Sequence, residues 1–478
     1  MTSVPAVDSS TSVYDWSSSP EDPSYYKRQT WGAEIIEDVW NRYNHGEQNL
    51  FLGADVTATK PVQSAAILAH ARDAWISLRF ELPIIAAHTE QDADDNTLIT
   101  YRTARDAEDA QAWAERTVIL HDGHTDLDGL RYEIGQKPTP DSNGDQTFLY
   151  FIARSDTSFG ILMHTSHVPV DGRGTKIILA RFLKKLALRS ANLTPFARRL
   201  ADSNEVMEGH DFSETLNSIM TGLVTGMPHM HGFKVRQIGP GQLATCSTFS
   251  AEESAKFIQF TRSNSFTVNQ VVHAALMMVC AFDNPPSPNT PSDAAFVGYG
   301  LVNCRHRLQP EYSGRDGYPG YCLGASPIVV PLSILTAASD VGEKAQLIQM
   351  ATAVKAEYLR QKAYPSLLAV IRQEVDLILS DFRKTKTLPA PWMGPWCAGD
   401  GIGEAYLDAT YDGAEGNTIL TIDNFFSSLN KTDPGPYFRA FSWAGRLILN
   451  VDYNEYAMPR EVVQSWVDKW AEFLRLAI

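Results

Sequence analysis

The chain has 478 residues, a formal net charge of −15, 44% hydrophobic residues and 20% charged residues. This excess of negative charge excludes an extended basic surface for nucleic acid or anionic lipid, although it allows a local basic patch that binds a small anion. A chain of this length usually forms more than one hydrophobic core, so we expect two domains of similar size.

The N-terminal residues and the cysteines predict the cellular compartment. Residues 1–30 are rich in Ser, Pro and Asp and contain no apolar stretch typical of an export signal, which predicts a polar flexible tail. The five cysteines are widely spaced without a C-x-x-C pair, a pattern typical of free thiols in a reducing cytosol. No run of about 18 apolar residues occurs, which excludes a membrane-spanning helix. We therefore expect a cytoplasmic protein without a membrane partner.

Residues 31–191 form the expected N-terminal domain. Residues 61–83 carry Ala and Ile near helical spacing and end at a proline, which predicts a helix. Two β-rich runs, 146–154 and 159–167, are separated by four residues and predict neighbouring strands. A further helix is expected over 175–190, where apolar residues recur along one stripe.

Residues 242–478 form the expected C-terminal domain, joined to the first by a crossover linker over 192–241. Ser250 and Glu253 form an S-x-x-E capping box that predicts a helix, and a second helix follows from about Thr267. The other expected elements are strands over 294–307 and 327–333, a helical stretch near 341–382, a loop over 387–416, a strand over 418–426, a hairpin over 437–454 that turns near Ala444 and Gly445, and a helix over 458–474. Each domain mixes sheet and helix, which predicts the α+β class.

The segment HVPVDG at 167–172 lies between a predicted strand and a predicted helix and concentrates the candidate catalytic residues. A zinc site is disfavoured because His164 and His167 would point to opposite faces of a strand, while Pro169 opposes a helix. A phosphate-binding loop over 172–176 is disfavoured because the G-x-x-x-x-G-K-[ST] spacing is missing. We therefore expect no metal site.

General-base catalysis fits this segment better. A histidine at the end of a strand can project into a cleft, so His167 is the candidate for proton transfer. Asp171, followed by Gly172, can stay inside the turn and shape its backbone. From spacing alone, a structural histidine in a turn is an equal alternative for His167. His164 lies within an apolar strand and is interpreted as structural.

The segment 167–172 resembles the HxxxDG signature of the chloramphenicol-acetyltransferase-like superfamily. This superfamily includes BAHD acyltransferases, condensation domains of peptide synthetases and trichothecene O-acetyltransferases. Further segments resemble the same superfamily: 250–277, 301–310, 317–326 and 441–470. The DFGWG signature of plant BAHD enzymes is missing, since residues 422–428 read IDNFFSS. The resemblance is therefore closest to fungal trichothecene O-acetyltransferases.

The resemblance implies two chloramphenicol-acetyltransferase-like domains that form a pseudo-dimer with an interdomain tunnel. It implies that His167 is the general base, that Asp171 and Gly172 are structural, and that Arg305 is the salt-bridge partner of Asp171. The implied reaction is acyl transfer from an acyl-CoA, by family default acetyl-CoA, to a hydroxyl of a small terpenoid or polyketide. The chain would hold no permanently bound cofactor and act as a monomer.

Two further groups of polar residues are candidates by location. For the oxyanion or the acceptor alcohol they are Asn424, Ser427 and Ser428. For the phosphates of CoA they are Arg383, Lys384 and Lys386. An ordinary polar or solvated role is the more common explanation for residues of both groups. Neither serine lies in a G-x-S-x-G elbow, so a covalent serine hydrolase is disfavoured.

Other classes of function share the expected fold. One alternative is a condensation-domain-like pericyclase or isomerase, whose tunnel would shape a single substrate. Another is a condensing enzyme that takes its acyl group from a carrier protein, and a third is a relative that only binds. The HxxxDG segment is intact and no carrier-protein or adenylation domain accompanies it. A freestanding acyltransferase is therefore the favoured prediction.

Overall fold

A computed structural model of the chain describes most of its residues. The described residues are 13–124, 126–188, 219, 228–234, 243–308, 310–337, 341–364 and 367–478. The predicted crossover linker, 192–241, lies outside the described residues except at 219 and 228–234, so it stays a prediction.

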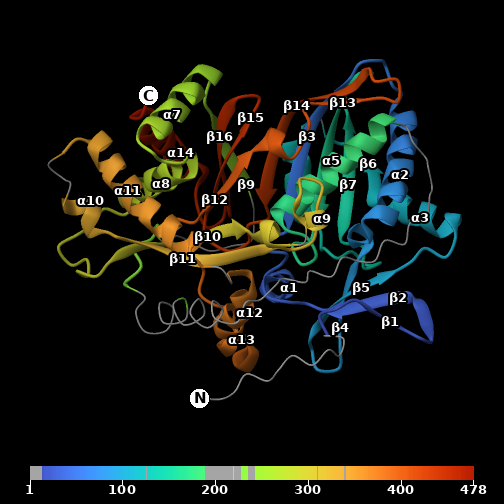
Figure 1. The fold of residues 1–478 in the computed structure, drawn as a ribbon, viewed down its shortest axis with the longest axis horizontal. Coiled ribbons are helices and arrows are strands. Elements are labelled where there is room, and N and C mark those ends of the chain that lie inside the picture. Colours follow the sequence, from blue (N-terminus) through green and yellow to red (C-terminus); the bar gives the residue numbers. More distant parts are fainter. Residues whose placement is uncertain are drawn as a thin grey trace.

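A six-stranded sheet lies at the centre of one side of the molecule (Figure 1). Its strands, in spatial order, are β13 (Thr410–Asp412), β14 (Thr418–Leu429), β3 (Leu50–Ala58), β8 (Ser158–Thr165), β7 (Thr147–Ala153) and β6 (Val118–Leu120). All neighbouring strands are antiparallel except β6 and β7. The predicted neighbouring strands are confirmed as β7 and β8. Because β13 and β14 come from residues beyond 400, the sheet combines segments of both predicted domains.

Helices cover both faces of the six-stranded sheet. They are α2 (Ser64–Glu81), followed by η1 (Pro83–Ala86), α3 (Ala107–Thr117) and α5 (Gly172–Leu188) on one face, and α4 (Leu127–Gly135) on the other. Leu52 packs in the core beneath α2 and α5, whereas its neighbour Phe51 packs with α4. Successive residues of a strand point to opposite faces, so both faces of β3 are apolar. α2 and α5 confirm the helices predicted over 61–83 and 175–190.

A four-stranded sheet forms the core of the other side of the molecule. Its strands, in spatial order, are β12 (Cys397–Ile402), β15 (Tyr437–Trp443), β16 (Arg446–Tyr453) and β9 (Leu243–Thr248). The helices that pack with it are α7 (Ala251–Ser263), α8 (Val268–Asp283), α11 (Glu343–Lys362) and α14 (Arg460–Arg475). The predicted capping box of Ser250 and Glu253 is confirmed. The predicted turn is also confirmed, with φ of 49° at Ala444 and 71° at Gly445.

The strand β12 corrects the prediction of a loop over 387–416. It pairs in parallel with β15, and η3 (Gly403–Ala405) and β13 follow within the same region. The sequence of β12, CAGDGI, contains two glycines and no alternation of apolar side chains. The sequence of this segment therefore does not predict a strand. Its strand conformation depends on backbone pairing with β15 and not on its own side chains.

β10 (Ala295–Asn303) and β11 (Leu323–Pro331) form an antiparallel ribbon that extends from the four-stranded sheet toward the six-stranded sheet (Figure 1). The segment between them contains η2 (Cys304–Arg307) and α9 (Pro310–Ser313). Its residue Gly320 pairs with Val170, just before α5. The other described helices are α1 (Ala33–Tyr43), α10 (Ser333–Ala337), α12 (Leu367–Ile378) and α13 (Ser380–Thr385). The ribbon therefore brings residues 304–322 to the predicted catalytic segment.

Part of residues 1–30, predicted to be a flexible tail, is folded into a small four-stranded sheet. Its strands, in spatial order, are β1 (Ser17–Ser19), β2 (Asp22–Gln29), β5 (Thr97–Arg102) and β4 (His88–Gln91). Arg28 of β2 forms an ion pair with Glu34, and both side chains are buried. Pairing with β5 satisfies the backbone of a Ser- and Asp-rich segment whose composition alone predicts disorder. Residues 1–12 lie outside the described residues.

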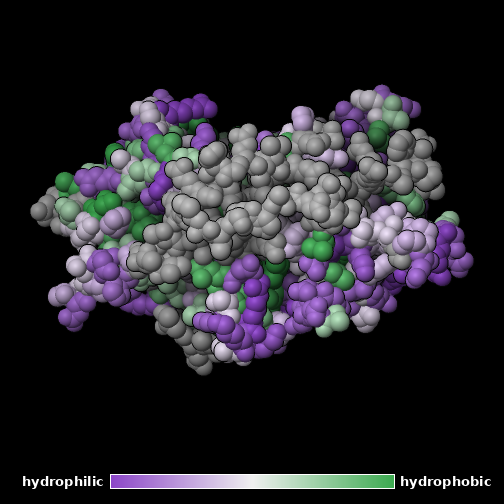
Figure 2. Space-filling view, turned by 60° about the horizontal axis from the view of Figure 1, so that its bottom comes forward, coloured by the Kyte–Doolittle hydropathy of each residue, from purple (hydrophilic) through white to green (hydrophobic). Residues whose placement is uncertain are grey.

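The described helices can be compared with the prediction that the chain has no membrane-spanning helix. Hydrophilic residues make up most of the described surface along the lower edge of the face in Figure 2. Within the described ranges, no single helix has both the length and the apolar composition needed to cross a membrane. α7 and α8 meet that test only together, and they are bent by 100° at their junction.

Candidate active site

The turn between β8 and α5 positions His167, as the sequence predicts. β8 ends at Thr165 and α5 begins at Gly172. The N–H of Ser166 donates to the carbonyl of Gln146 at 2.9 Å, and the hydroxyl oxygen of Ser166 accepts from the N–H of Val168 at 3.3 Å. These bonds fix the backbone on both sides of His167.

Asp171 is fully buried, and its carboxylate accepts hydrogen bonds from backbone N–H groups of the turn. Its Oδ1 accepts from the N–H groups of Arg173 at 3.0 Å and Gly174 at 2.7 Å, as a helix N-cap does. Its Oδ2 accepts from the N–H of Cys322 at 2.9 Å. The guanidinium of Arg305 donates to both oxygens, at 2.8 and 2.9 Å. The predicted ion pair is therefore present, and it links the turn after β8 to the segment between β10 and β11.

Arg305 is fully buried, and two backbone carbonyls and the side-chain oxygen of Asn303, at 3.3 Å, accept its remaining donors. Its Nε donates to Tyr318 at 2.7 Å, and one terminal nitrogen donates to Gly320 at 2.6 Å. Burial opposes ionisation of Asp171, but the charge and hydrogen bonds of Arg305 outweigh it, so the pKa of Asp171 lies below its ordinary value. The pair is charged, and each charge depends on the other.

The two glycines of the turn have different roles. A Cβ on Gly174 would lie 1.8 Å from the carbonyl oxygen of Pro319, so only glycine allows this close approach. A Cβ on Gly172 would meet nothing within 4 Å, and Gly172 lines the cavity beside His167. Gly172 was the glycine singled out by the sequence, yet packing requires Gly174. The need for Gly174 arises from the approach of residue 319, which only the fold reveals.

A cavity of about 130 Å³ lies where the two larger sheets meet. The six-stranded sheet, α5 and the turn before α5 contribute Leu50, His167, Gly172, Arg173, Lys176 and Leu429. The ribbon, the four-stranded sheet and their flanking segments contribute Asn269, Leu301, Asn303, Leu323, Tyr358, Cys397, Ala398, Gly399, Asp400, Tyr406, Tyr437 and Arg439. The predicted catalytic histidine therefore lines a cavity that both parts of the molecule enclose.

His167 is almost completely buried, with 8% of its surface exposed. Its Nδ1 is enclosed and makes no hydrogen bond to another described residue, so Nε2 is the nitrogen available in the cavity. Burial lowers the pKa of His167 to about 4, opposed by a hydrogen bond of the ring to the backbone carbonyl of His167 itself and by the charge of Asp171, and aided by the charge of Arg439. His167 is therefore neutral near pH 7 and can accept a proton. His164 instead stacks on Phe51 with ring centroids 4.4 Å apart, as expected of a structural histidine.

A buried charged group that the sequence did not predict lines the same cavity. Asp400 forms ion pairs with Lys176, at 3.1 Å, and with Arg439, at 2.9 Å. Burial opposes its ionisation, but these two cations hold the pKa of Asp400 at about 2. Arg173 also lines the cavity and lies 4.8 Å from the ring centroid of Tyr406. Three cationic side chains and one carboxylate leave the cavity with excess positive charge.

The other predicted candidates lie away from this cavity. Asn424 is exposed and contacts Asp55 at 3.4 Å, and Ser428 donates to Asp452. Ser427 is buried in β14, and its hydroxyl has no partner within the part of the chain that the structure describes. None of the three lines the cavity. Their place in β14 follows from strand pairing with β3, which the sequence does not specify.

The predicted CoA-binding cluster also lies away from the cavity. Arg383 pairs with Asp376 at 2.7 Å, Lys384 approaches Asp381 at 3.9 Å, and Lys386 pairs with Asp95 at 3.1 Å. These side chains are about half exposed or more, and none lines the His167 cavity. Local carboxylates on neighbouring elements explain the cluster as a solvated helix end.

One group of side chains has the donor types and spacing of a metal site. His121 and His124 each contact Glu133, at 3.3 and 2.9 Å. Lys137 also donates to Glu133 at 2.8 Å, and the N–H of Gly123 points to His121 Nδ1 at 3.4 Å. These hydrogen bonds account for the group without an ion, and it does not line the His167 cavity.

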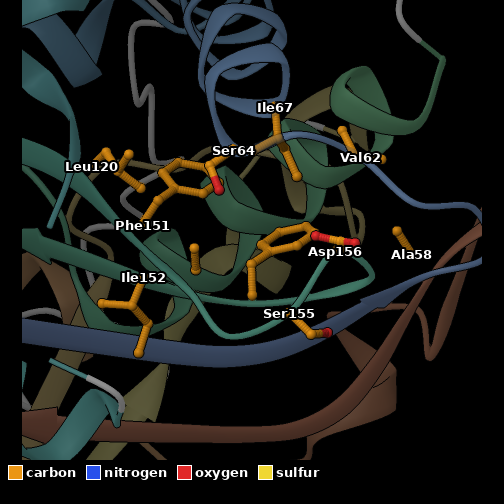
Figure 3. Close-up of a pocket in the computed structure, with 11 residues that line it drawn as sticks. Ala58, Val62, Ser64, Ile67, Leu120, Phe151, Ile152, Ser155 and Asp156 are labelled. Carbon is orange, nitrogen blue, oxygen red and sulfur yellow. The ribbon is translucent and has the colours of Figure 1, made fainter. Parts of the chain in front are cut away.

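A second hollow lies at the outer edge of the six-stranded sheet (Figure 3). Its volume is about 10 Å³, and apolar side chains such as Ile67, Leu120 and Phe151 surround it. A space of this size holds about one water molecule. It is therefore not a substrate site.

Comparisons with known proteins agree with this geometry. The family described as 15-O-acetyltransferase Tri3 matches residues 5–370. The chain is 21% identical to the trichothecene 15-O-acetyltransferase TRI3 of Fusarium sporotrichioides, covering 97% of this chain and 96% of that protein. It is 23% identical to the trichothecene O-acetyltransferase TRI3 of Trichoderma arundinaceum, covering 96% of each.

Solved structures share the fold. The structure of TRI3 trichothecene 15-O-acetyltransferase from Fusarium sporotrichioides superimposes with a TM-score of 0.86 at 18% identity, covering 99% of this chain and 100% of that one. The first condensation domain of the calcium-dependent antibiotic synthetase gives a TM-score of 0.65 at 10% identity, covering 94% of this chain and 96% of that one. These similarities extend over the whole chain, so the two sheets and the ribbon between them belong to one known architecture.

We predict that Asp171→Ala and Arg305→Ala each lower the free energy of unfolding by about 3–5 kcal/mol, because each leaves a buried charge without its partner. Chemical denaturation measures the change. The stabilisation should be present above the unfolded pKa of about 3.9 and be lost as the pH falls through the lower folded pKa of Asp171. Arg105→Ala removes an exposed ion pair with Asp109 and should leave the free energy of unfolding nearly unchanged. An Arg305→Ala variant as stable as the unsubstituted protein would contradict this account.

Proposed function

The chain belongs to the 15-O-acetyltransferase Tri3 family, within the chloramphenicol-acetyltransferase-like superfamily, and from that premise we propose an acetyl-CoA-dependent reaction with His167 as general base. The enzyme is an O-acetyltransferase of secondary metabolism. The proposal adds the donor, the base and the acceptor. Its main support is that a neutral, buried imidazole lines a cavity enclosed by both sheets.

The reaction requires a proton acceptor because a hydroxyl does not ionise near neutral pH. Nε2 of His167 accepts the hydroxyl proton while the hydroxyl oxygen forms a bond to the thioester carbonyl carbon. The carbon–sulfur bond of the tetrahedral intermediate then breaks, and the imidazolium returns the proton to the departing thiolate. A positioned base of this kind contributes roughly 10²- to 10⁴-fold to the rate.

Negative charge develops on the thioester oxygen during this reaction, and the cations of the cavity support its stabilisation. Lys176 lies on α5, and Arg439 lies on the facing strand β15. With Asp400 they form a group of paired, buried charges, and electrostatic interactions are stronger at buried sites than in water. We assign the electrostatic role to this group in place of Asn424, Ser427 and Ser428.

The acceptor is proposed to be a terpenoid alcohol similar to a trichothecene. The curated relatives are named for trichothecene acetylation. Four leucines line the cavity, and such apolar side chains suit a terpenoid skeleton. They are Leu50, Leu301, Leu323 and Leu429. We also propose that the cavity belongs to a tunnel between two pseudo-dimeric domains, because both sheets contribute its lining.

We predict that His167→Ala abolishes acetyl transfer while the melting temperature stays near that of the unsubstituted protein. The assay follows thiol release from acetyl-CoA in the presence of a trichothecene with a free 15-hydroxyl. His229→Ala replaces an exposed histidine, 69% exposed at its side chain, and should leave turnover unchanged. Near-normal turnover by His167→Ala would refute the general-base role. Product formation without thiol release would indicate the pericyclase or isomerase alternative.

The pH dependence of kcat/KM provides a second test. Because the pKa of His167 is lowered to about 4, the protonated, inactive imidazole forms only at acidic pH. We expect kcat/KM to fall as the pH decreases toward about 4, with the acid limb well below the ordinary histidine pKa of about 6.5. An acid limb at about 6.5 or above would contradict the proposed environment of His167.

Lys176→Met tests the electrostatic role of the cavity. We expect kcat to fall roughly 10- to 100-fold, since the substitution removes one cation from the site of developing charge. Lys384→Met removes an exposed lysine and should leave kcat and the KM for acetyl-CoA unchanged. Steady-state kinetics with acetyl-CoA measure both variants, and equal effects of the two substitutions would exclude a specific role for Lys176.

A further inference from the structure

The cavity at His167 is small for the substrates of the proposed reaction. Its volume is about 130 Å³, whereas pockets for small molecules usually occupy roughly 300–1,000 Å³. The acceptor therefore needs space beyond the present cavity walls. Buried polar atoms that lack a partner in the protein indicate where the oxygen atoms of such a ligand would lie, because buried donors and acceptors are rarely left unpaired.

A tryptophan lies directly behind one wall of this cavity. Trp396 packs against Leu50, Ala398, Leu429 and Tyr437, and all four of these residues line the cavity. The ring centroids of Trp396 and Tyr437 are 5.7 Å apart. Only one layer of side chains therefore separates the indole of Trp396 from the cavity.

Tyr299 and Trp392 join Trp396 in one aromatic group. The ring centroid of Tyr299 lies 5.6 Å from that of Trp396 and 5.3 Å from that of Trp392. Tyr299 precedes Leu301 by two positions in β10, so both side chains point to the same face of the ribbon. Leu301 lines the cavity. The aromatic group therefore continues the surface that Leu301 and Tyr437 present to the cavity.

Glu374 adds a buried carboxyl group to these rings. It lies on α12, which packs against β11, and only 1% of its surface is exposed. Its Oε1 has no hydrogen-bond partner in the part of the chain that the structure describes. Burial raises the pKa of Glu374 to about 8, and no described donor or cation lowers it. Burial also raises the pKa of Tyr299, and the charge of Glu374 adds to this effect, which places the carboxyl group near Tyr299.

The two tryptophans of the aromatic group carry unpaired donors. Nε1 of Trp392 and Nε1 of Trp396 are both enclosed, and neither has a hydrogen-bond partner among the described residues. An indole N–H only donates, whereas a protonated carboxyl group, such as that of Glu374 near pH 7, both donates and accepts. Apolar rings with three unpaired polar groups fit a ligand that carries oxygen atoms on an apolar skeleton.

We propose that Glu374, Trp392 and Trp396 form a polar subsite for the acceptor and make hydrogen bonds with its oxygen atoms other than the reacting hydroxyl. This inference rests on the proposed function, since it concerns the acceptor of the same reaction. The subsite selects an oxygen-bearing terpenoid or polyketide alcohol over a hydrocarbon alcohol of the same size. An alcohol without these oxygens would leave the buried polar groups unpaired.

The first test is calorimetric titration with a trichothecene that has a free 15-hydroxyl, in the absence of acetyl-CoA. Glu374→Leu should weaken binding about 10-fold, because it removes a hydrogen bond at nearly constant side-chain volume. Glu374→Gln should bind nearly as tightly as the unsubstituted protein, since its neutral amide both donates and accepts. Trp396→Phe keeps an aromatic ring but removes the N–H, and should also weaken binding about 10-fold. The control Glu415→Leu replaces an exposed glutamate and should leave binding unchanged.

The melting temperature separates recognition of the acceptor from a structural role of Glu374. A buried carboxyl group without a partner destabilises the fold, so unliganded Glu374→Leu should melt at the same temperature as the unsubstituted protein or higher. The trichothecene should raise the melting temperature of the unsubstituted protein and of Glu374→Gln more than that of Glu374→Leu. A lower melting temperature of unliganded Glu374→Leu, together with unchanged affinity for the trichothecene, would overturn the proposal.

Steady-state kinetics of thiol release test the same subsite during turnover. Glu374→Leu and Trp396→Phe should each raise the KM for the trichothecene about 10-fold and leave the KM for acetyl-CoA unchanged. If Glu374→Leu does not fold, Trp396→Phe decides, and an unchanged affinity of that variant for the trichothecene overturns the proposal.

The subsite and the proposed function fail differently. Full turnover by His167→Ala refutes the general-base role and leaves the calorimetric result as it is. Absence of trichothecene binding by the unsubstituted protein refutes the proposed acceptor, and the subsite with it. Equal affinity of the unsubstituted protein, Glu374→Leu and Trp396→Phe for the trichothecene refutes only the subsite.

Discussion

The buried ion pair between Asp171 and Arg305 is the interaction on which the rest of the site depends. Together with the pairing of Val170 and Gly320, it joins the turn after β8 to the segment between β10 and β11, two parts of the chain that are far apart in the sequence. Both side chains are fully buried, so neither charge is tolerated without the other. His167 lies four residues before Asp171 in the same turn. Its position beside the cavity therefore depends on a contact made by the opposite side of the molecule.

Burial affects the two functional residues of the turn in opposite ways. Asp171 receives a guanidinium and three backbone N–H groups, which compensate for lost water, and its carboxylate stays charged. The imidazole of His167 has no comparable compensation, so burial keeps it neutral. A neutral imidazole can accept a proton, and a charged carboxylate can hold a backbone turn. The difference in solvation thus separates the proposed chemical role from the structural role.

Charge inside the cavity differs from charge over the whole protein. The chain carries −15 overall, yet Lys176, Arg173 and Arg439 outnumber Asp400 around the cavity. Charges in this enclosed space are weakly screened, whereas the lysines and arginine at 383–386 are exposed and paired with nearby carboxylates. Net charge correctly argues against a broad basic surface, but it does not describe a small cavity whose lining comes from α5, β12 and β15.

The sequence by itself determined the local structure and the central motif. Capping residues, apolar periodicity and turn residues act between near neighbours, so α2, α5, α7, the β7–β8 pair and the turn at Ala444 were predictable. Resemblance to the superfamily identified His167, Asp171 and Arg305. Only the tertiary structure decided that 397–402 is a strand, that position 174 must be glycine, and that Lys176, Asp400 and Arg439 meet. Each of these depends on contacts between residues far apart in the chain, which no local pattern encodes.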